Sequence, residues 1–106
     1  MAHIKANPTL QELQEYVALH WLERGFDNTP TQECLLLAEE VGELAKAIRK
    51  DSGMQTDANS HVGNIAHELV DVLWIITSIA NQYGVDLEQA FREKELVNHQ
   101  RVWSRN

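Results

Sequence analysis

Helix-capping signals recur along this chain at the points where helices would begin. A Ser, Thr or Asp followed three residues later by Glu or Gln forms a capping box, in which the two residues satisfy the free backbone N–H groups of a helix start. The pairs are Thr9 with Glu12, Thr29 with Gln32, and Asp86 with Gln89. Pro30, directly after Thr29, also suits the first helical position. The capping pattern therefore predicts a chain made of helices.

Apolar residues between these signals repeat every three or four positions, which is the period of an amphipathic helix. Residues 51–60 lack this period and are rich in turn formers, so they are predicted to form a loop. The predicted helices cover about 9–24, 30–50, 61–83 and 87–103. We expect one all-α domain over residues 1–106, folded as an antiparallel four-helix bundle.

The composition excludes several classes of partner. The 106 residues carry a formal net charge of −7, which disfavours nucleic acid and anionic membranes, because both attract clustered Lys and Arg. Apolar runs are far too short to span a bilayer. The single cysteine, Cys34, excludes an internal disulfide and favours a reducing compartment. A cytoplasmic protein is expected, and so short a chain would gain stability from self-association.

Two acidic motifs lie inside otherwise apolar helical segments. They are Glu39-Glu40-Val41-Gly42-Glu43 and Glu68-Leu69-Val70-Asp71. Acids three positions apart on a helix are neighbours, and unpaired carboxylates are costly to bury. A divalent cation would resolve that cost. Because the candidate ligands are all oxygens, the motifs indicate Mg²⁺, with Mn²⁺ as an alternative, rather than Zn²⁺.

A helical wheel at about 100° per residue separates these acids. The predicted core stripe of the second helix is Leu37, Val41, Leu44 and Ile48. Glu40 borders that stripe, Glu43 lies at its edge, and Glu39 turns toward the basic side of the helix. In the third helix, Glu68 falls within the core arc and Asp71 lies beside it. Glu68 is therefore the acid that most needs a cation.

Basic and amide side chains gather on one face at the end of the fourth predicted helix. Lys94, Asn98 and Arg101 lie within about 60° of one another on the wheel. A point charge, an amide and a planar guanidinium together suit a polyphosphate and its sugar. Favourable charge near a helix C-terminus is the alternative explanation.

In combination, these motifs resemble the MazG-like nucleoside triphosphate pyrophosphohydrolases, an all-α family. The resemblance covers roughly residues 9–103 and includes the segment Tyr83-Gly84-Val85-Asp86-Leu87-Glu88-Gln89-Ala90. It implies hydrolysis of a nucleoside triphosphate or deoxynucleoside triphosphate between the α and β phosphates, with Mg²⁺ or Mn²⁺, giving the monophosphate and pyrophosphate. It also implies a homodimer or homotetramer of MazG-type bundles.

The resemblance assigns roles to individual residues. The implied metal ligands are Glu40, Glu43, Glu68 and Asp71. Glu39 matches the first acid of the family motif and receives a supporting catalytic role. The implied phosphate and sugar contacts are Lys94, Asn98 and Arg101. Trp21 fits core packing better than base stacking, but the family contacts bases with aromatic side chains of the first helices, so it is kept as a substrate-contact candidate.

Other interpretations remain open at this point. The acids could form ion pairs with Lys and Arg at helix edges. The chain could also be a nucleotide- or metal-binding module without turnover, a structural helical partner, or a phosphoribosyl-ATP pyrophosphatase-like hydrolase of related fold. The zinc-protease helix motif, by contrast, is excluded, because the position four residues after His67 is Asp71 rather than histidine.

Overall fold

Four helices and no strand make up the part of the chain described by the computed structural model, residues 3–104. The helices are α1 (Leu10–Glu23), α2 (Pro30–Asp51), α3 (Ile65–Gln82) and α4 (Leu87–His99). α3 begins four residues later than predicted, and α4 ends four residues earlier. None of these helices is long and apolar enough to cross a membrane.

Local capping explains where the helices begin. The Thr9 and Thr29 hydroxyls accept from the backbone N–H three residues on, and both capping boxes are closed by the reciprocal bond. α3 starts at an N-cap the sequence patterns did not suggest, Asn64, whose side chain accepts from the His67 N–H. Asp86 caps α4, but its box is not closed, because the Gln89 side chain donates to Glu93 instead. The predicted capping box at Asp86 is therefore wrong, although the N-cap is present.

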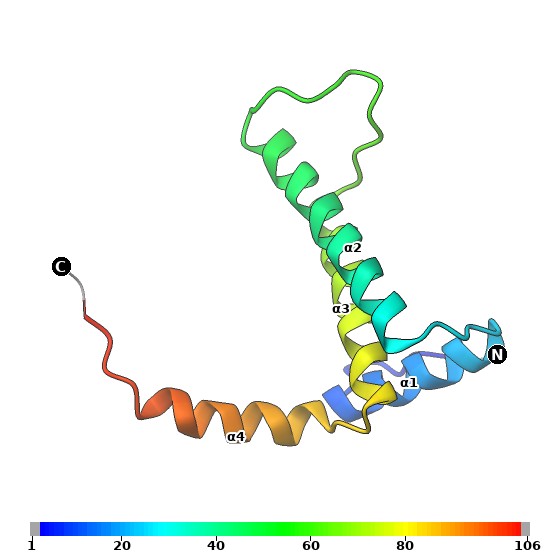
Figure 1. The fold of residues 1–106 in the computed structure, drawn as a ribbon, viewed down its shortest axis with the longest axis vertical. Coiled ribbons are helices and arrows are strands. Elements are labelled where there is room, and N and C mark those ends of the chain that lie inside the picture. Colours follow the sequence, from blue (N-terminus) through cyan, green and yellow to red (C-terminus); the bar gives the residue numbers. More distant parts are fainter. Residues whose placement is uncertain (1–2, 105–106) are drawn as a thin grey trace.

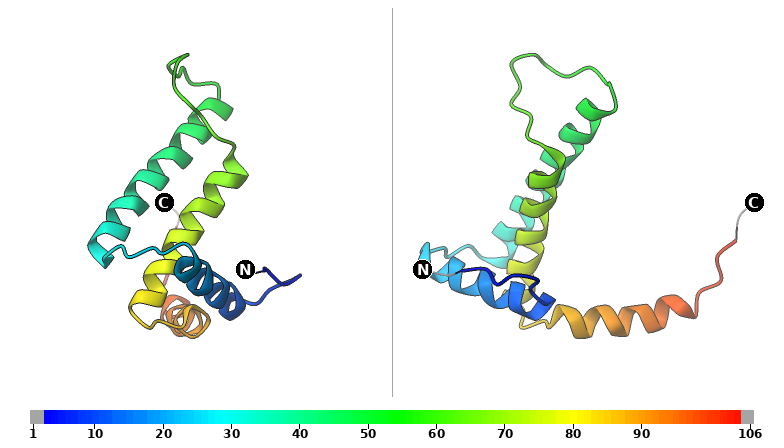
Figure 2. Two further views of the ribbon diagram at one scale, coloured as in Figure 1. Left: turned by 90° about the vertical axis from the view of Figure 1, so that its right-hand side faces the viewer. Right: turned by 180° about the vertical axis from the view of Figure 1, so that it is seen from behind.

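α2 and α3 form an antiparallel pair, and α1 packs across the C-terminal end of α3 (Figures 1 and 2). α4 packs against α1 and then extends away from the α2–α3 pair (Figure 1). The predicted four-helix antiparallel bundle is therefore not closed within one chain. The radius of gyration, 16.8 Å, exceeds the roughly 13 Å expected of a compact domain of this length.

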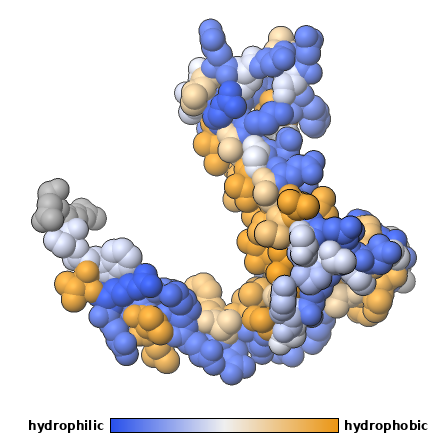
Figure 3. All heavy atoms as spheres, in the orientation of Figure 1, coloured by the Kyte–Doolittle hydropathy of each residue, from blue (hydrophilic) through white to orange (hydrophobic). Residues whose placement is uncertain are grey.

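The packing face of α2 differs from the predicted stripe. Val41 and Ile48, both assigned to the core, are 47% and 48% exposed. Glu33 and Ala47 are buried instead, and Glu40 is half-buried. α2 therefore packs on α3 with the side that holds Glu33 and Glu40. Apolar side chains are left on the side of the α2–α3 arm that faces α4 (Figure 3).

Gln14 of α1 joins three elements through its buried side chain. Its Nε2 donates to Asn81 Oδ1 at 3.2 Å and to the Val85 carbonyl at 2.7 Å. Its Oε1 accepts from the Leu87 N–H at 2.9 Å, at the start of α4. One amide therefore fixes α1, the end of α3 and the first turn of α4 relative to one another.

Replacing Gln14 with leucine should destabilise the fold. The change leaves the Val85 carbonyl and the Leu87 N–H without partners, at a cost of about 1–3 kcal/mol. Urea unfolding at a fixed protein concentration measures this cost. The control is Gln11→Leu, one turn earlier on the exposed side of α1, which should change stability by less than about 0.5 kcal/mol. Equal effects of the two substitutions would contradict the anchoring role.

Candidate metal and nucleotide site

Three carboxylates from two helices converge on one point. Glu40 of α2 and Glu68 and Asp71 of α3 each present a carboxylate oxygen, and these oxygens lie within 4.8 Å of one another. The convergence follows from the antiparallel pairing, which places the second half of α2 beside the first turns of α3. Oxygen ligands at this spacing are suited to a hard divalent cation such as Mg²⁺ or Mn²⁺.

Electrostatics within this acidic cluster (Glu40, Glu68 and Asp71) favour a cation. Burial raises the pKa of Glu40, and the negative charges of Asp71 and Glu68, followed by those of Glu39 and Glu43, raise this pKa further. Among the residues that the structure describes, no ion pair joins any of the three acids to Lys or Arg. The ion-pair interpretation left open by the sequence therefore finds no support at these three positions.

The two remaining motif acids lie outside this cluster. Glu43 is partly buried one turn further along α2, where its Oε2 lies 3.9 Å from Lys46 Nζ. Glu39 is exposed on the surface of α2. The four predicted metal ligands are thus divided into three that converge and one, Glu43, that is adjacent.

Gly63 lies directly against the Glu68 carboxylate. A Cβ at position 63 would overlap Glu68 Oε1, and it would crowd the carboxylate carbon as well. Gly63 ends the connection between α2 and α3, immediately before the Asn64 N-cap. The missing side chain is therefore what lets Glu68 turn its carboxylate toward this connection. Sequence patterns did not suggest this role, because it depends on a contact between a loop and a helix.

A cavity of about 360 Å³ extends from the acidic cluster along the α2–α3 pair. Glu40 and Asp71 line it, and so does Glu33, two helical turns before Glu40. Its aromatic wall is formed by Phe26 and Trp74, which pack edge to face with ring centroids 5.9 Å apart. Such a cavity, acidic at one end and aromatic along one side, has the chemical character of a site for a metal-bound ligand with a flat ring.

Several lining residues are not among those predicted from the sequence. They are Trp74, Arg24, Phe26 and Glu33. On the wheel, at about 100° per residue, Glu33 falls about 40° from Leu37, between Glu40 and the nearest edge of the predicted core stripe. Arg24 and Phe26 follow the last turn of α1, and no periodic pattern marks residues there.

Trp21, the predicted substrate contact, lies on a different cavity. Its Nε1 donates to Glu33 Oε1 at 3.2 Å. With Val17, Ser78 and Gln82 it lines a neighbouring apolar space of about 290 Å³ between α1 and α3. Trp21 therefore reaches the cavity beside the acidic cluster only through Glu33, and Trp74 provides the aromatic surface there.

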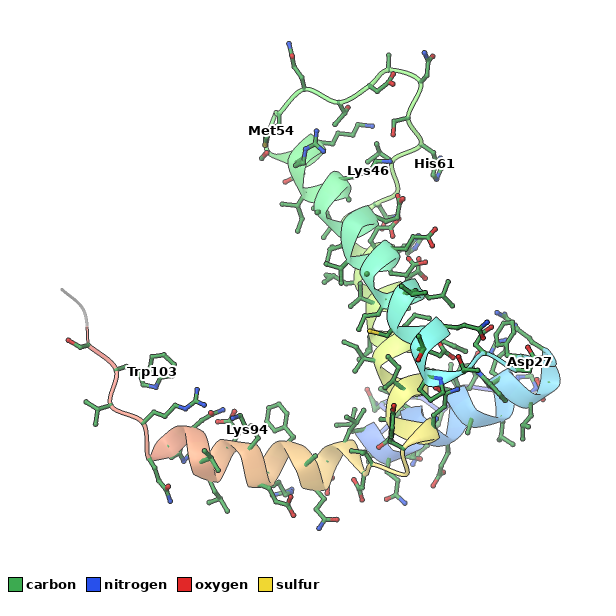
Figure 4. The ribbon with its side chains drawn as sticks, in the orientation of Figure 1. Asp27, Lys46, Met54, His61, Lys94 and Trp103 are labelled. Carbon is green, nitrogen blue, oxygen red and sulfur yellow. The ribbon has the colours of Figure 1, made fainter. Side chains whose placement is uncertain are left out.

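The predicted basic group on α4 is not brought to the acidic cluster by this chain. Lys94 lies on α4, far from the α2–α3 arm (Figure 4). Asn98 donates to Glu95 at 3.3 Å. Arg101 lies beyond the end of α4 at His99, so the helical arc assumed for the three residues is interrupted. The wheel could not foresee this, because it assumed that the helix continued to about residue 103.

Substituting Gly63 with alanine should weaken metal binding. The new Cβ forces the Glu68 carboxylate to rotate, and loss of support around a ligand costs about 10- to 100-fold in metal affinity. Calorimetric titration with Mn²⁺ measures the loss. Gly42→Ala is the matched control, because a Cβ there meets no atom within 4 Å. That control should keep its affinity and gain about 1 kcal/mol of stability from helix propensity; unchanged affinity in Gly63→Ala would contradict the positioning role.

Glu40→Gln should stabilise the metal-free protein at neutral pH. Because the folded-state pKa of Glu40 is raised above its ordinary value of 4.5, the folded state binds this proton more tightly than the unfolded state does. Its stabilising effect is complete below pH 4.5 and is lost as pH rises through the raised pKa. Thermal unfolding in a chelator should show this fall in the natural protein and a smaller one in Glu40→Gln. Identical pH profiles would show that the pKa of Glu40 is not raised in the folded state.

Comparison with known proteins supports a family assignment. The family model described as the MazG nucleotide pyrophosphohydrolase domain matches residues 28–98. Two relatives named dATP/dGTP diphosphohydrolase, from Salmonella phage PMBT28 and Cyanophage S-2L, are each 30% identical over 92% of this chain. The chain spans 29% of the length of the Salmonella phage relative and 80% of the cyanophage one.

Solved structures agree with this assignment. iMazG from Vibrio DAT 722 is 37% identical, with a TM-score of 0.60, over 86% of this chain and 94% of its own. The Cyanophage S-2L MazG-like pyrophosphohydrolase, bound to dGDP and three catalytic Mn²⁺ ions per active site, is 29% identical, with a TM-score of 0.68. The match covers 93% of this chain and 89% of the cyanophage chain. The resemblance seen in the acidic motifs is thereby confirmed, and this chain belongs to the MazG nucleotide pyrophosphohydrolase family, whose enzymes hydrolyse nucleotide phosphoanhydride bonds.

Proposed function

We propose that this protein hydrolyses a nucleoside or deoxynucleoside triphosphate between the α and β phosphates, with Mg²⁺ or Mn²⁺, to give the monophosphate and pyrophosphate. The observation that carries the proposal is the convergence of Glu40, Glu68 and Asp71 from two helices at the end of a cavity. The cyanophage relative, which binds dGDP and Mn²⁺, supports both the ligand class and the use of a metal.

Glu40, Glu68 and Asp71 would hold the metal, with Glu43 completing the set from the next turn of α2. When bound, such ions supply charge to the phosphate oxygens and lower the pKa of an attacking water. The three acids fit this demand, because an ionised carboxylate can only accept and because none of them has a cationic partner among the described residues. Glu39, exposed on α2 one residue before Glu40, would orient the attacking water or receive its proton.

The reaction needs no protein nucleophile. Water oxygen would form a bond to the α-phosphorus while the bond from that phosphorus to the bridging oxygen breaks, and pyrophosphate leaves with the bonding electrons. The carboxylates would fix the phosphate chain so that attacking and leaving oxygens lie in line. Arg24, which lines the same cavity, is the cation that this chain itself offers to a phosphate.

A homodimer or homotetramer is part of the proposal. A single chain leaves large apolar side chains exposed on α4, including Phe91 at 64% and Leu96 at 67%. Its aliphatic core is small, since Val17 is the largest aliphatic side chain among the buried residues described. A second subunit would cover these surfaces. It could also bring Lys94, Asn98 and Arg101 of its own α4 toward the phosphates. The free, exposed Cys34 fits a cytoplasmic location.

Glu68→Gln should abolish most of the activity. Changing a residue that only supports a metal ligand already lowers metal affinity or activity by about 10- to 100-fold. Loss of a ligand itself should therefore reduce pyrophosphate release by about 100-fold or more. The assay uses a panel of nucleoside and deoxynucleoside triphosphates and phosphoribosyl-ATP, each with Mg²⁺ or Mn²⁺. Glu15→Gln, the same change on the exposed side of α1, is the matched control.

The same panel separates the alternatives. Release of inorganic phosphate instead of pyrophosphate would contradict the proposed bond cleavage. Nucleotide binding by calorimetry without any product would indicate a binding module. A melting temperature that responds to neither metal nor nucleotide would indicate a structural protein, because a ligand of the native state must stabilise it.

A further inference from the structure

Glu33 is the most deeply buried ionisable side chain in the described structure, at 1% exposure, and the metal chemistry does not use it. Its Oε1 accepts from Ser78 Oγ at 2.8 Å and from Trp21 Nε1 at 3.2 Å. Its Oε2 is also buried and has no hydrogen-bond partner. Oε1 of this carboxyl group is therefore held by two donors, whereas Oε2 lacks a hydrogen-bond donor.

An unpartnered buried oxygen is rare in native proteins and costly. Two fixed donors account for the orientation of Glu33, because Ser78 is itself buried and Trp21 is held between α1 and α3. Neither of these two donors bonds to Oε2. Glu33 also lines the cavity beside the acidic cluster, so a donor group that enters this cavity could supply the partner of Oε2.

The adjoining cavity is the one that begins at the acidic cluster. Glu33 and Glu40 are seven residues apart on α2, which is about 10.5 Å along the helix axis. A nucleotide whose phosphates lie at Glu40 and Asp71 would extend its sugar and base over a similar distance. Phe26 and Trp74 lie along this path, and aromatic side chains of this kind stack on bases of any sequence. The base would thus end near Glu33.

We propose that Glu33 is the specificity-determining residue for the nucleobase, with Oε2 accepting a hydrogen bond from an N–H group on the base edge. This inference rests on the proposed function. It predicts a preference for bases with exposed N–H donors. Guanine presents two adjacent donors, while adenine and cytosine present one amino group each. Thymine and uracil flank their single N–H with two carbonyl oxygens, which a carboxylate repels. Guanine nucleotides should therefore be the best substrates and thymine nucleotides the poorest.

The decisive variant is Glu33→Gln. Glutamine has almost the same shape, and its carbonyl can keep both bonds from Trp21 and Ser78. Its amide NH₂ would then replace Oε2 and offer a donor where the natural protein offers an acceptor. Because hydrogen bonds to charged groups are the stronger ones, the ratio of kcat/KM for dGTP over dTTP should fall about 10- to 100-fold.

Binding of the monophosphates gives a readout that does not need turnover. Calorimetry with dGMP and dTMP should show the same loss of preference in Glu33→Gln, and Glu15→Gln should leave the ratio unchanged. If no triphosphate is hydrolysed, the proposed function fails, yet the binding ratio still tests Glu33. An equal loss for all bases in Glu33→Gln would assign Glu33 a purely structural role and overturn the inference.

The natural protein tests the inference even if Glu33→Gln does not fold, which thermal unfolding would reveal. Its own panel should rank dGTP above dTTP in both kcat/KM and monophosphate binding. Equal use of the two by the natural protein would overturn the inference without any variant.

Discussion

The antiparallel contact between α2 and α3 is the interaction on which the rest of the structure depends. It places Glu40 opposite Asp71 at one level and Glu33 opposite Ser78 two turns away. Metal ligands and the buried Glu33 carboxyl group therefore belong to one continuous face. A slip of this pairing by one helical turn would separate both sets at once. The fold thus fixes the distance between the two ends of the cavity by helix geometry, without relying on a loop.

This contact face is rich in charge where stability alone would favour apolar groups. Glu40 is repelled by four neighbouring acids, and Glu33 keeps one oxygen without a partner. Both features destabilise the isolated chain, and both would be relieved by a ligand that brings cations and N–H donors. Packing elsewhere compensates through polar anchors such as Gln14, whose side chain joins α1 to both α3 and α4. Strain of this kind is common at functional sites.

Local signals were sufficient for much of this chain. Thr9 and Thr29 cap helices as their sequence context indicates, because a capping box involves only residues three positions apart. The convergence of Glu40 with Glu68 and Asp71 was also anticipated from their spacing. Glu33 was not predicted as a site residue, although the wheel places it beside the core stripe, because a single glutamate outside any motif carries no metal or catalytic signal. Gly63 could not be found in this way, because its role comes from a loop that meets a helix.

The sequence by itself determined that the chain is helical, where α1, α2 and α4 begin, and which acids could share a cation, because capping and periodicity depend on neighbours along the chain. The MazG motifs also belong to this level. Only the tertiary structure decided which face of α2 meets α3, that Glu43 lies beside the converging acids, and that Trp74 rather than Trp21 lines the cavity. It also decided that α4 leaves the α2–α3 pair with apolar side chains uncovered. These outcomes depend on contacts between distant residues, which no local pattern encodes.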